Sequence, residues 1–492
     1  TGQPLGQFAM SLFGESVVFV VYPQESGKPA GVLLLRAVNE RALQKALATW
    51  NIERRVKLEK QFLAKAEYIK RTESKPHLPG KEQIQYYFVQ GPVFALSDDE
   101  TLIQSIVRRS SGENPQPTLV DSDRYQTARR SLAEDCFATL YFNPQAWNPG
   151  WELEEGKSRV EKWIASLWKR SYAIGAGLRA DRGMALDVVV HYDPANLPER
   201  WRQLVERTSG FPRFLNQVPA GAFLVLAGKQ DLAGVDRLIT AEMDEKSRQQ
   251  WEYAMQVSRG LLLGLDLFED VLPTFGPNWG LCVFPRQALD PNAVPAEGLV
   301  AFELPPASDE QNPITVRKAL KNALNTGFNL VAAVQNSKPQ AKPVILKSEQ
   351  HTGGPVHWID TIGPYRPAYC LSGEYLIFAS SPRLIAEFLS PTQSKLVDSS
   401  VFFPLWTNRH KTPEGQLLFL NWLSIRQFLK SHHAVLLDQA VKSHALPREE
   451  AEKRLTRLQE ILEVLDGAYL GLQIQEDRIH LTLGGITRAD EP

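Results

Sequence analysis

Few residues of this chain have the types and spacing that chemistry on a substrate requires. Gly175, Gly177 and Ala180 match the loose dinucleotide-binding pattern G-x-G-x-x-A. That pattern works where a strand leads into a helix, because the helix N-terminus binds the pyrophosphate. Here a predicted strand over 185–192, with three successive valines, follows instead. We therefore interpret these glycines as part of a strand and predict no cofactor.

The densest histidine group is His432, His433 and His444. If residues 423–444 formed one helix, His433 and His444 would share a face but lie about 16 Å apart at ~1.5 Å rise per residue. That separation is too large for one metal ion, and the chain has no H-E-x-x-H or paired C-x-x-C motif. We interpret these histidines as solvated helix residues and predict no metal site.

No motif for nucleophilic catalysis or phosphate binding is present. The chain lacks a G-x-S-x-G elbow and a G-x-x-x-x-G-K-[ST] loop. Adjacent acidic pairs at 98–99 and 154–155 cannot converge on one substrate atom. Asp121 and Asp398 recur in equivalent contexts, and their place just before predicted helices favours capping. We therefore predict no catalytic residue and a function without catalysis.

Two tryptophans are candidates for a contact surface. Trp147 and Trp151 flank Asn148-Pro149-Gly150 in a predicted loop that follows a strand. Exposed aromatic residues in loops often contact partners or ligands. We predict a partner surface at Trp147 and Trp151 and assign most of the other tryptophans to the core.

Composition excludes several classes of protein. The chain has 492 residues, 43% of them apolar and 23% charged, which is typical of globular proteins. Its 55 Lys and Arg residues nearly balance its 56 Asp and Glu residues, so no overall field attracts nucleic acid or an anionic membrane. No run reaches the ~18 apolar residues of a membrane span. Three cysteines lie in or beside apolar runs and predict buried thiols without disulfides: Cys136, Cys282 and Cys370.

An internal repeat determines how the elements are organised. Phe13-Gly14 and the following run to Pro23 return as Phe275-Gly276 and the run to Pro285, in register over eleven positions. Leu119-Val-Asp-Ser returns at Leu396, and the segment 91–103 returns as 373–385. Anchors that recur in the same order indicate two diverged copies of one module. We predict a first module over residues 1–212 and a second over residues 213–492.

Reading the two copies together predicts the fold class. Each copy contains an apolar strand, a second strand, an amphipathic helix, a hairpin with Gly in its turn, a short helix and a closing hairpin. Strands that come as hairpins with helices between them favour an α+β fold. The chain is therefore expected to contain two tandem antiparallel sheet modules with helices on one face.

The copies differ in their lead-in. The second copy begins with a predicted strand over 222–227 and long helical material over 231–272. The first copy has only residues 1–12 in that place, and the chain begins at Thr1. Two explanations stay open: the first copy lost this element, or a segment upstream, such as a removed signal or anchor, is absent from the sequence.

These features together resemble a bacterial family called domain of unknown function 3352. The resemblance is carried by Leu-Val-Asp-Ser at 119 and 396, the hairpin and helix over 373–389, and the strand after Val218-Pro219-Ala220. It spans nearly the whole chain. The resemblance implies an envelope or secreted protein, often with an N-terminal signal or anchor, and implies no activity or site residue.

Our hypothesis is a non-enzymatic binding or assembly component of the bacterial cell envelope, periplasmic or secreted, with a protein partner or self-association. Two alternatives are a carrier of an apolar, lipid-like ligand and a hydrolase with its site between the modules. A cytoplasmic location is the alternative for the compartment.

Overall fold

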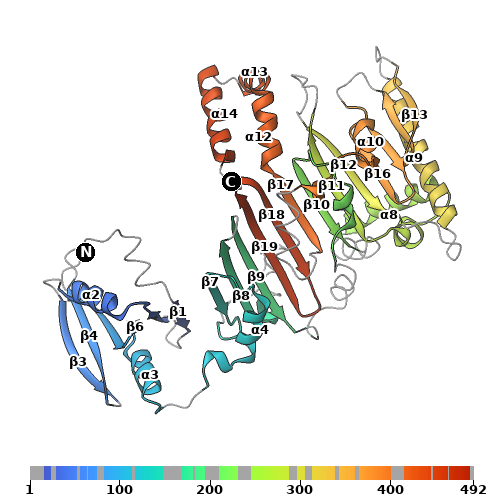
Figure 1. The fold of residues 1–492 in the computed structure, drawn as a ribbon. Helices are drawn as coiled ribbons and strands as arrows, with labels where there is room; N and C mark the ends of the chain where they lie inside the picture. Colours follow the sequence, from blue (N-terminus) through green and yellow to red (C-terminus); the bar gives the residue numbers. More distant parts are fainter. Residues whose placement is uncertain are drawn as a thin grey trace. The chain divides into compact units, whose positions relative to one another are not determined.

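The chain forms two compact units, which Figure 1 draws as ribbons. The first comprises Thr1–Asp123 with Ala146–Gly150, and the second comprises Arg124–Gln145 with Trp151–Pro492. The computed structural model describes residues 16–23, 29–52, 56–63, 65–74, 82–113, 117–147, 168–180, 183–193, 195, 210–230, 245–286, 296–304, 313–337, 343–360, 365–399, 415–444, 447–463 and 465–487. Within these ranges, no helix has the length and apolar character that a bilayer crossing requires.

The described strands of the first unit form one antiparallel sheet in the order β1-β2-β6-β5-β4-β3. Gly91 adopts a φ of +57° in the turn between β5 and β6, as the Gln90-Gly91 hairpin prediction requires. The strands are β1 (Ser16–Tyr22), β2 (Ala30–Arg36), β3 (Val56–Leu63), β4 (Ala66–Ser74), β5 (Glu82–Gln90) and β6 (Val93–Ser97).

Helices α2 (Glu40–Asn51) and α3 (Glu100–Ser110) cover opposite faces of this sheet. Neighbouring residues of β5 show this, because successive side chains of a strand point to opposite faces. Tyr87 packs in the α2 cluster, and Phe88 packs with Ile103 of α3. Asp99 caps α3, since its carboxylate accepts the Thr101 N–H at 2.8 Å.

The described strands of the second unit form a longer antiparallel sheet in the order β13-β14-β15-β16-β12-β11-β10-β17-β18-β19-β9-β8-β7. Its strands are β7 (Ala138–Phe142), β8 (Ser171–Ala180), β9 (Met184–Tyr192), β10 (Leu224–Lys229), β11 (Asn278–Pro285), β12 (Ala296–Glu303), β13 (Ile345–His351), β14 (Gly354–Asp360), β15 (Ala368–Leu371), β16 (Tyr375–Ala379), β17 (Gln416–Asn421), β18 (Leu465–Ile474) and β19 (Arg478–Thr487).

Strand order confirms the internal repeat. In the first copy the order is β1-β2-β6-β5-β4-β3, and in the second it is β11-β12-β16-β15-β14-β13, which is the same order of equivalent elements. β7, β8 and β9 likewise correspond to β17, β18 and β19. β8 and β18 each carry a register shift at their second residue, Tyr172 and Asp466. Such bulges are positional features of a fold, so their recurrence supports a common origin.

The compact units are divided differently from the two repeats. β9 of the first repeat pairs with β19 of the second, in register from Arg478 opposite His191 to Gly484 opposite Ala185. Strands β7–β9 therefore belong to the sheet of the second unit, although they lie before residue 212. The boundary at 212/213 stays a prediction for the repeats, while the compact units separate near residue 123.

Helices also lie on both faces of the second sheet. α10 (Pro382–Leu389) contributes Ile385 to the core on one face, where Ile377 of β16 is fully buried. α9 (Pro313–Asn336) contributes Leu320 to a cluster on the other face, with the adjacent Leu376. The α+β class with antiparallel sheets is confirmed. The expectation of helices on one face is corrected, because both alternating sets of strand residues are apolar and both need cover.

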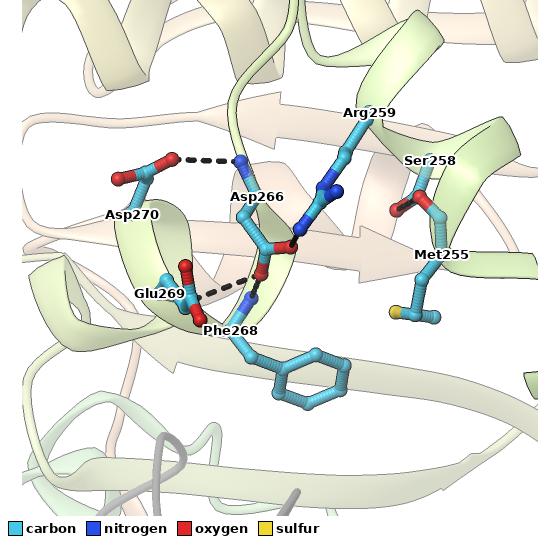
Figure 2. Close-up of polar contacts among 7 residues, drawn as sticks. All are labelled: Met255, Ser258, Arg259, Asp266, Phe268, Glu269 and Asp270. Atoms are coloured by element: carbon cyan, nitrogen blue, oxygen red, sulfur yellow. Dashed lines mark hydrogen bonds and ion pairs between the residues drawn. The ribbon is translucent and has the colours of Figure 1, made fainter. Parts of the chain in front are cut away.

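The lead-in of the second repeat contains a strand, β10, and helical material that is interrupted. α8 (Glu245–Leu261) ends before Leu263 and Gly264, which both have positive φ, and the π-helical turn η4 (Leu267–Val271) follows. Asp266 starts this turn by accepting the N–H groups of Phe268 and Glu269, and its carboxylate also contacts Arg259 (Figure 2). The helical material predicted over 231–272 is thus interrupted at this corner, and residues 231–244 lie outside the described residues.

Three helices follow β17 and pack on one another, and the first and third also pack against β18 (Figure 1). They are α12 (Trp422–Ser431), α13 (His433–His444) and α14 (Arg448–Glu463). Arg426 of α12 joins them to the sheet, since its guanidinium donates to the Leu462 carbonyl and to Asp466 at 2.8 Å. The remaining described elements are α4 (Asp123–Ser131) and the short turns η1 (Leu119–Asp121), η3 (Arg213–Gln217), η5 (Leu272–Thr274) and η6 (Leu396–Asp398).

Candidate functional site

The most unusual surface among the described residues is the outer edge of β1. β1 is the last strand of its sheet and pairs with β2 alone among the described strands. Its apolar side chains are exposed on both faces: Val18 is 45% exposed, Phe19 68% and Tyr22 46%. Isolated exposed apolar residues are ordinary, but an exposed run along a strand edge is typical of a pairing surface.

The equivalent strand of the second repeat is buried. The eleven-position register aligns Val20 with Cys282 and Tyr22 with Phe284. Cys282 is fully buried and Phe284 is 4% exposed, because β10 pairs with β11 and the core closes over it. The apolar sequence of β1 is therefore typical of a central strand, although β1 occupies an edge.

A second candidate is a buried polar cluster where the two repeats meet within the second unit. Arg179 and Asp187 form an ion pair, with 2.8 Å between Nε and Oδ2, and both side chains are buried. The Arg179 N–H does not point along this line, so the contact is an ion pair rather than a hydrogen bond. Thr482 donates its hydroxyl to Asp187 Oδ1 at 2.9 Å, and the His480 Nε2 atom lies 3.4 Å from the same oxygen.

The electrostatics of this cluster favour an ionised Asp187. Burial by itself raises the pKa of this carboxyl, but His480, the Arg179 charge and the Thr482 hydrogen bond outweigh burial, and the pKa is below its usual value. Cys136 lies close by, since a Cβ at Gly177 would sit 2.6 Å from its sulfur. Burial raises the pKa of the Cys136 thiol, which lowers the thiolate fraction that a nucleophile needs. The cluster thus links β9 to β19 through side-chain contacts, and its surroundings do not activate the Cys136 thiol.

His191, on the same buried face, gives the unit a pH dependence. It is fully buried, and its ring nitrogens lack hydrogen-bond partners among the described atoms. Burial lowers the pKa of His191; Asp477 acts in the opposite direction, while Arg478 and His480 lower this pKa further. The unfolded chain, with a histidine pKa of about 6.5, therefore binds more protons than the folded chain just below that pH.

We expect stability to fall as the pH drops through about 6.5 toward the lower folded pKa of His191. His191→Leu removes this contribution, so its urea midpoint should change less between pH 8 and pH 5 than that of the wild type. Urea unfolding at both pH values, followed by circular dichroism, measures the difference. Equal changes in the two proteins would contradict the assignment of this pH dependence to His191.

One polar cavity of about 650 Å³ lies beside the ends of β8 and β9. Its lining includes residues of both repeats, with three cationic and two acidic side chains. These charges suit a polar ligand better than an apolar one. The lining residues are Arg124, Gln145, Lys169, Arg170, Tyr172, Tyr192, Asp193 and Asp477.

The structure does not bring the residues predicted from the sequence into one site. Trp147 is half-buried at the end of a described segment, and Trp151 lies outside the described residues, so the predicted partner surface stays a prediction. Gly175 and Gly177 lie in β8, which turns back into β9 without a helix. They allow close approach of Ala128 and Cys136, which confirms their interpretation as strand residues.

The recurrent aspartates and His432 make local contacts in turns and at a helix end. Asp121 accepts the backbone N–H and the hydroxyl of Thr118, both at 2.7 Å, so it closes the turn η1 rather than capping the next helix. Asp398 accepts the Lys395 N–H at 3.4 Å in the equivalent turn. His432 lies between α12 and α13, where its Nδ1 atom contacts the Phe428 carbonyl at 3.1 Å. The described residues contain no group of His, Cys, Asp or Glu side chains that could hold a metal ion.

The cysteines agree in part with their interpretation as buried thiols. Cys282 and Cys370 are buried, Cys136 is half-buried, and all three are free. The sequence analysis missed the β1 edge and the polar cluster. The sequence contained a signal for this edge. Ser16–Tyr22 carries no charge and has apolar residues on both faces of the strand. In the place of the strand 222–227, which leads into the second copy, the first copy has only residues 1–12.

A family model described as "Protein of unknown function (DUF3352)" matches residues 14–448. None of the curated proteins matches the chain.

Proposed function

Because the chain belongs to the family of proteins of unknown function DUF3352, we propose its function from its own surfaces: it is a non-enzymatic binding or assembly component of the bacterial cell envelope. The observation that supports this proposal is the uncharged, exposed edge of β1. An open strand edge presents backbone N–H and C=O groups that another strand can pair with. The envelope location is supported by the resemblance to envelope and secreted proteins.

Site-specific photo-crosslinking in native cells tests the binding function. A photoreactive phenylalanine analogue at Phe19 should give a defined covalent adduct, because a partner on the β1 edge covers this side chain. The same analogue at Tyr253 of α8 is the matched control, since the two aromatic side chains are 68% and 71% exposed. Mass spectrometry of the adducts identifies the partner.

Adducts at Phe19 that are no more frequent or defined than those at Tyr253 would contradict a binding function of this edge. Fractionation of the same cells tests the location separately. We expect the protein in the periplasmic or outer fractions, and recovery with cytoplasmic markers would overturn the envelope part of the proposal without affecting the binding part.

The two alternatives gain no specific support. The 650 Å³ cavity is lined by charged and tyrosine side chains, which does not favour a lipid-like ligand. The raised pKa of the Cys136 thiol does not favour a nucleophile near Asp187 and His480. The carrier and the hydrolase therefore stay predictions from the sequence.

A further inference from the structure

The second repeat contains a strand, β10, that has no equivalent among the described residues of the first repeat. In the second repeat, β10 lies between β11 and β17 and pairs antiparallel with both, which joins the two halves of that repeat in one sheet. In the first repeat, the equivalents of β11 and β17 are β1 and β7. Both are the end strands of their sheets, and the described residues contain no strand in the position of β10. The two halves of the first repeat accordingly belong to different compact units.

Charge distinguishes these two edges from the other edges. β3, the other edge of the first sheet, carries Lys57, Glu59 and Lys60, and β13, the other edge of the second sheet, carries Lys347 and Glu349. Charged residues on an edge strand prevent pairing with further strands. β1 (SVVFVVY) and β7 (ATLYF) contain no charged residue. β1 and β7 therefore lack the charged residues that protect an edge strand against pairing. Their equivalents in the second repeat, β11 and β17, are both paired with β10.

β10 shows which chemistry suits such an edge. Its first five residues, Leu224–Gly228, are aliphatic or glycine. Val225 and Ala227 lie opposite Cys282 and Gly280 and are fully buried in the core on one face. In the eleven-position register, Gly280 and Cys282 of β11 are equivalent to Val18 and Val20 of β1. A strand that pairs with β1 as β10 pairs with β11 would therefore have Val18 and Val20 opposite the side chains of its equivalent face. Aliphatic residues at alternate positions would cover them.

We infer that the β1 edge binds an extended, uncharged, aliphatic strand of a partner protein, which pairs antiparallel with β1 as β10 pairs with β11. This inference rests on the proposed binding function and specifies the partner. β11 pairs with β10, a strand of different sequence, which is why we assign an unlike strand and not a second β1. Backbone hydrogen bonds would supply affinity, and the alternate aliphatic side chains would supply specificity.

A labelled peptide with the sequence of residues 222–230, AFLVLAGKQ, is the probe for the full chain. We expect saturable binding in fluorescence anisotropy. Val18→Lys should weaken binding about tenfold, equivalent to about 1.4 kcal/mol, because the ammonium would lose water beside an aliphatic strand. Ile52→Lys is the matched control and should bind like the wild type, since Ile52 is an exposed residue of the same unit outside β1.

Two N-methylated peptides separate strand pairing from adhesion of apolar side chains. Methyl groups on alternate backbone nitrogens block the donors of one strand edge, and the second peptide carries them on the other nitrogens. Only one edge of the peptide can pair with β1, so one peptide should lose binding and the other should retain it. Equal affinities of the two peptides, or equal binding by wild type and Val18→Lys, would overturn the inference.

Sedimentation of the chain without peptide tests the other occupant. A dimer that Val18→Lys dissociates, together with no peptide binding, would replace the partner strand by a second copy of this chain. Failure of the inference is distinguishable from failure of the proposed function. Defined adducts at Phe19 without peptide binding leave the function standing and overturn the strand partner, whereas absence of both overturns both.

Discussion

Asp187→Ala is expected to lower the free energy of unfolding of the second unit by about 3–5 kcal/mol, the usual cost of leaving one partner of a buried ion pair alone. The substitution leaves the Arg179 guanidinium buried without its carboxylate, and the Thr482 hydroxyl loses its acceptor. Burial of an unpaired charge is the main cost. Urea-dependent hydrogen exchange of peptides from β9 and β19 measures the change where the two repeats meet.

Two variants make this prediction specific to the ion pair. Arg179→Met with Asp187→Leu removes both charges and should recover most of the lost stability, since apolar replacement of a buried pair is often neutral. Asp477→Ala removes an exposed carboxylate nearby and should change stability by about 0.5 kcal/mol or less. A loss in Asp187→Ala as small as in Asp477→Ala would show that the pair does not stabilise the junction of the repeats.

The folded-state pKa of Asp187 adds a second readout. Because this pKa is below that of the unfolded chain, the stabilisation is complete above the unfolded value of about 3.9 and is lost as the pH falls through the lower folded value. The destabilisation caused by Asp187→Ala should therefore shrink in strong acid. A constant difference between the two proteins down to that range would argue against an ionised Asp187.

Phe214→Ala is expected to cost about 3–5 kcal/mol in the second unit, as for other buried phenylalanines. Phe214 is fully buried in the main core, where it contacts Phe388 with ring centroids 5.5 Å apart. Its ring lies against Gly280 of β11, so truncation leaves a cavity next to β11. Phe137→Ala is the control, because Phe137 is 61% exposed in the same unit.

A double-mutant cycle identifies the contact responsible. A Cβ at Gly280 would lie 2.1 Å from Cδ1 of Phe214, so Gly280→Ala should by itself destabilise the unit. In the double variant the new methyl group occupies part of the cavity left by Phe214→Ala. The combined loss should therefore be smaller than the sum of the single losses. Additive losses would mean that Phe214 and Gly280 are not packed on each other.

The local pattern of residue types was sufficient to predict the internal repeat and most of the helices and strands. Equivalent anchors predicted a duplication, and the two strand orders agree with it. Hairpin turns at Gly91 and Gly373 were predictable because short turns depend on residues near one another in sequence. Pattern failed at β3 and β14, which the sequence analysis did not identify. The sheet order shows that β3 is equivalent to β13 and β4 to β14.

The failure at β3 has a physical reason. Its sequence, VKLEKQFL, alternates only weakly, and charged residues occupy several positions because the strand is an edge. An edge strand pairs with one neighbour and buries few side chains, so its apolar and polar residues alternate only weakly. This alternation is the signal from which a strand is predicted. β1 shows the opposite case. Its strong apolar run predicts a central strand, while the structure places it at an edge.

The sequence by itself determined a duplicated α+β chain with antiparallel hairpins, and it indicated no catalytic, metal or cofactor site. The tertiary structure decided that helices cover both faces, that β9 of one repeat pairs with β19 of the other, and that β1 is an end strand among the described strands. It also decided that the buried face of β9 is the one bearing Asp187 and His191, while Met184 and Leu186 are exposed. Periodicity shows only that the two faces of a strand differ. Which face is buried depends on strands and helices far away in the sequence.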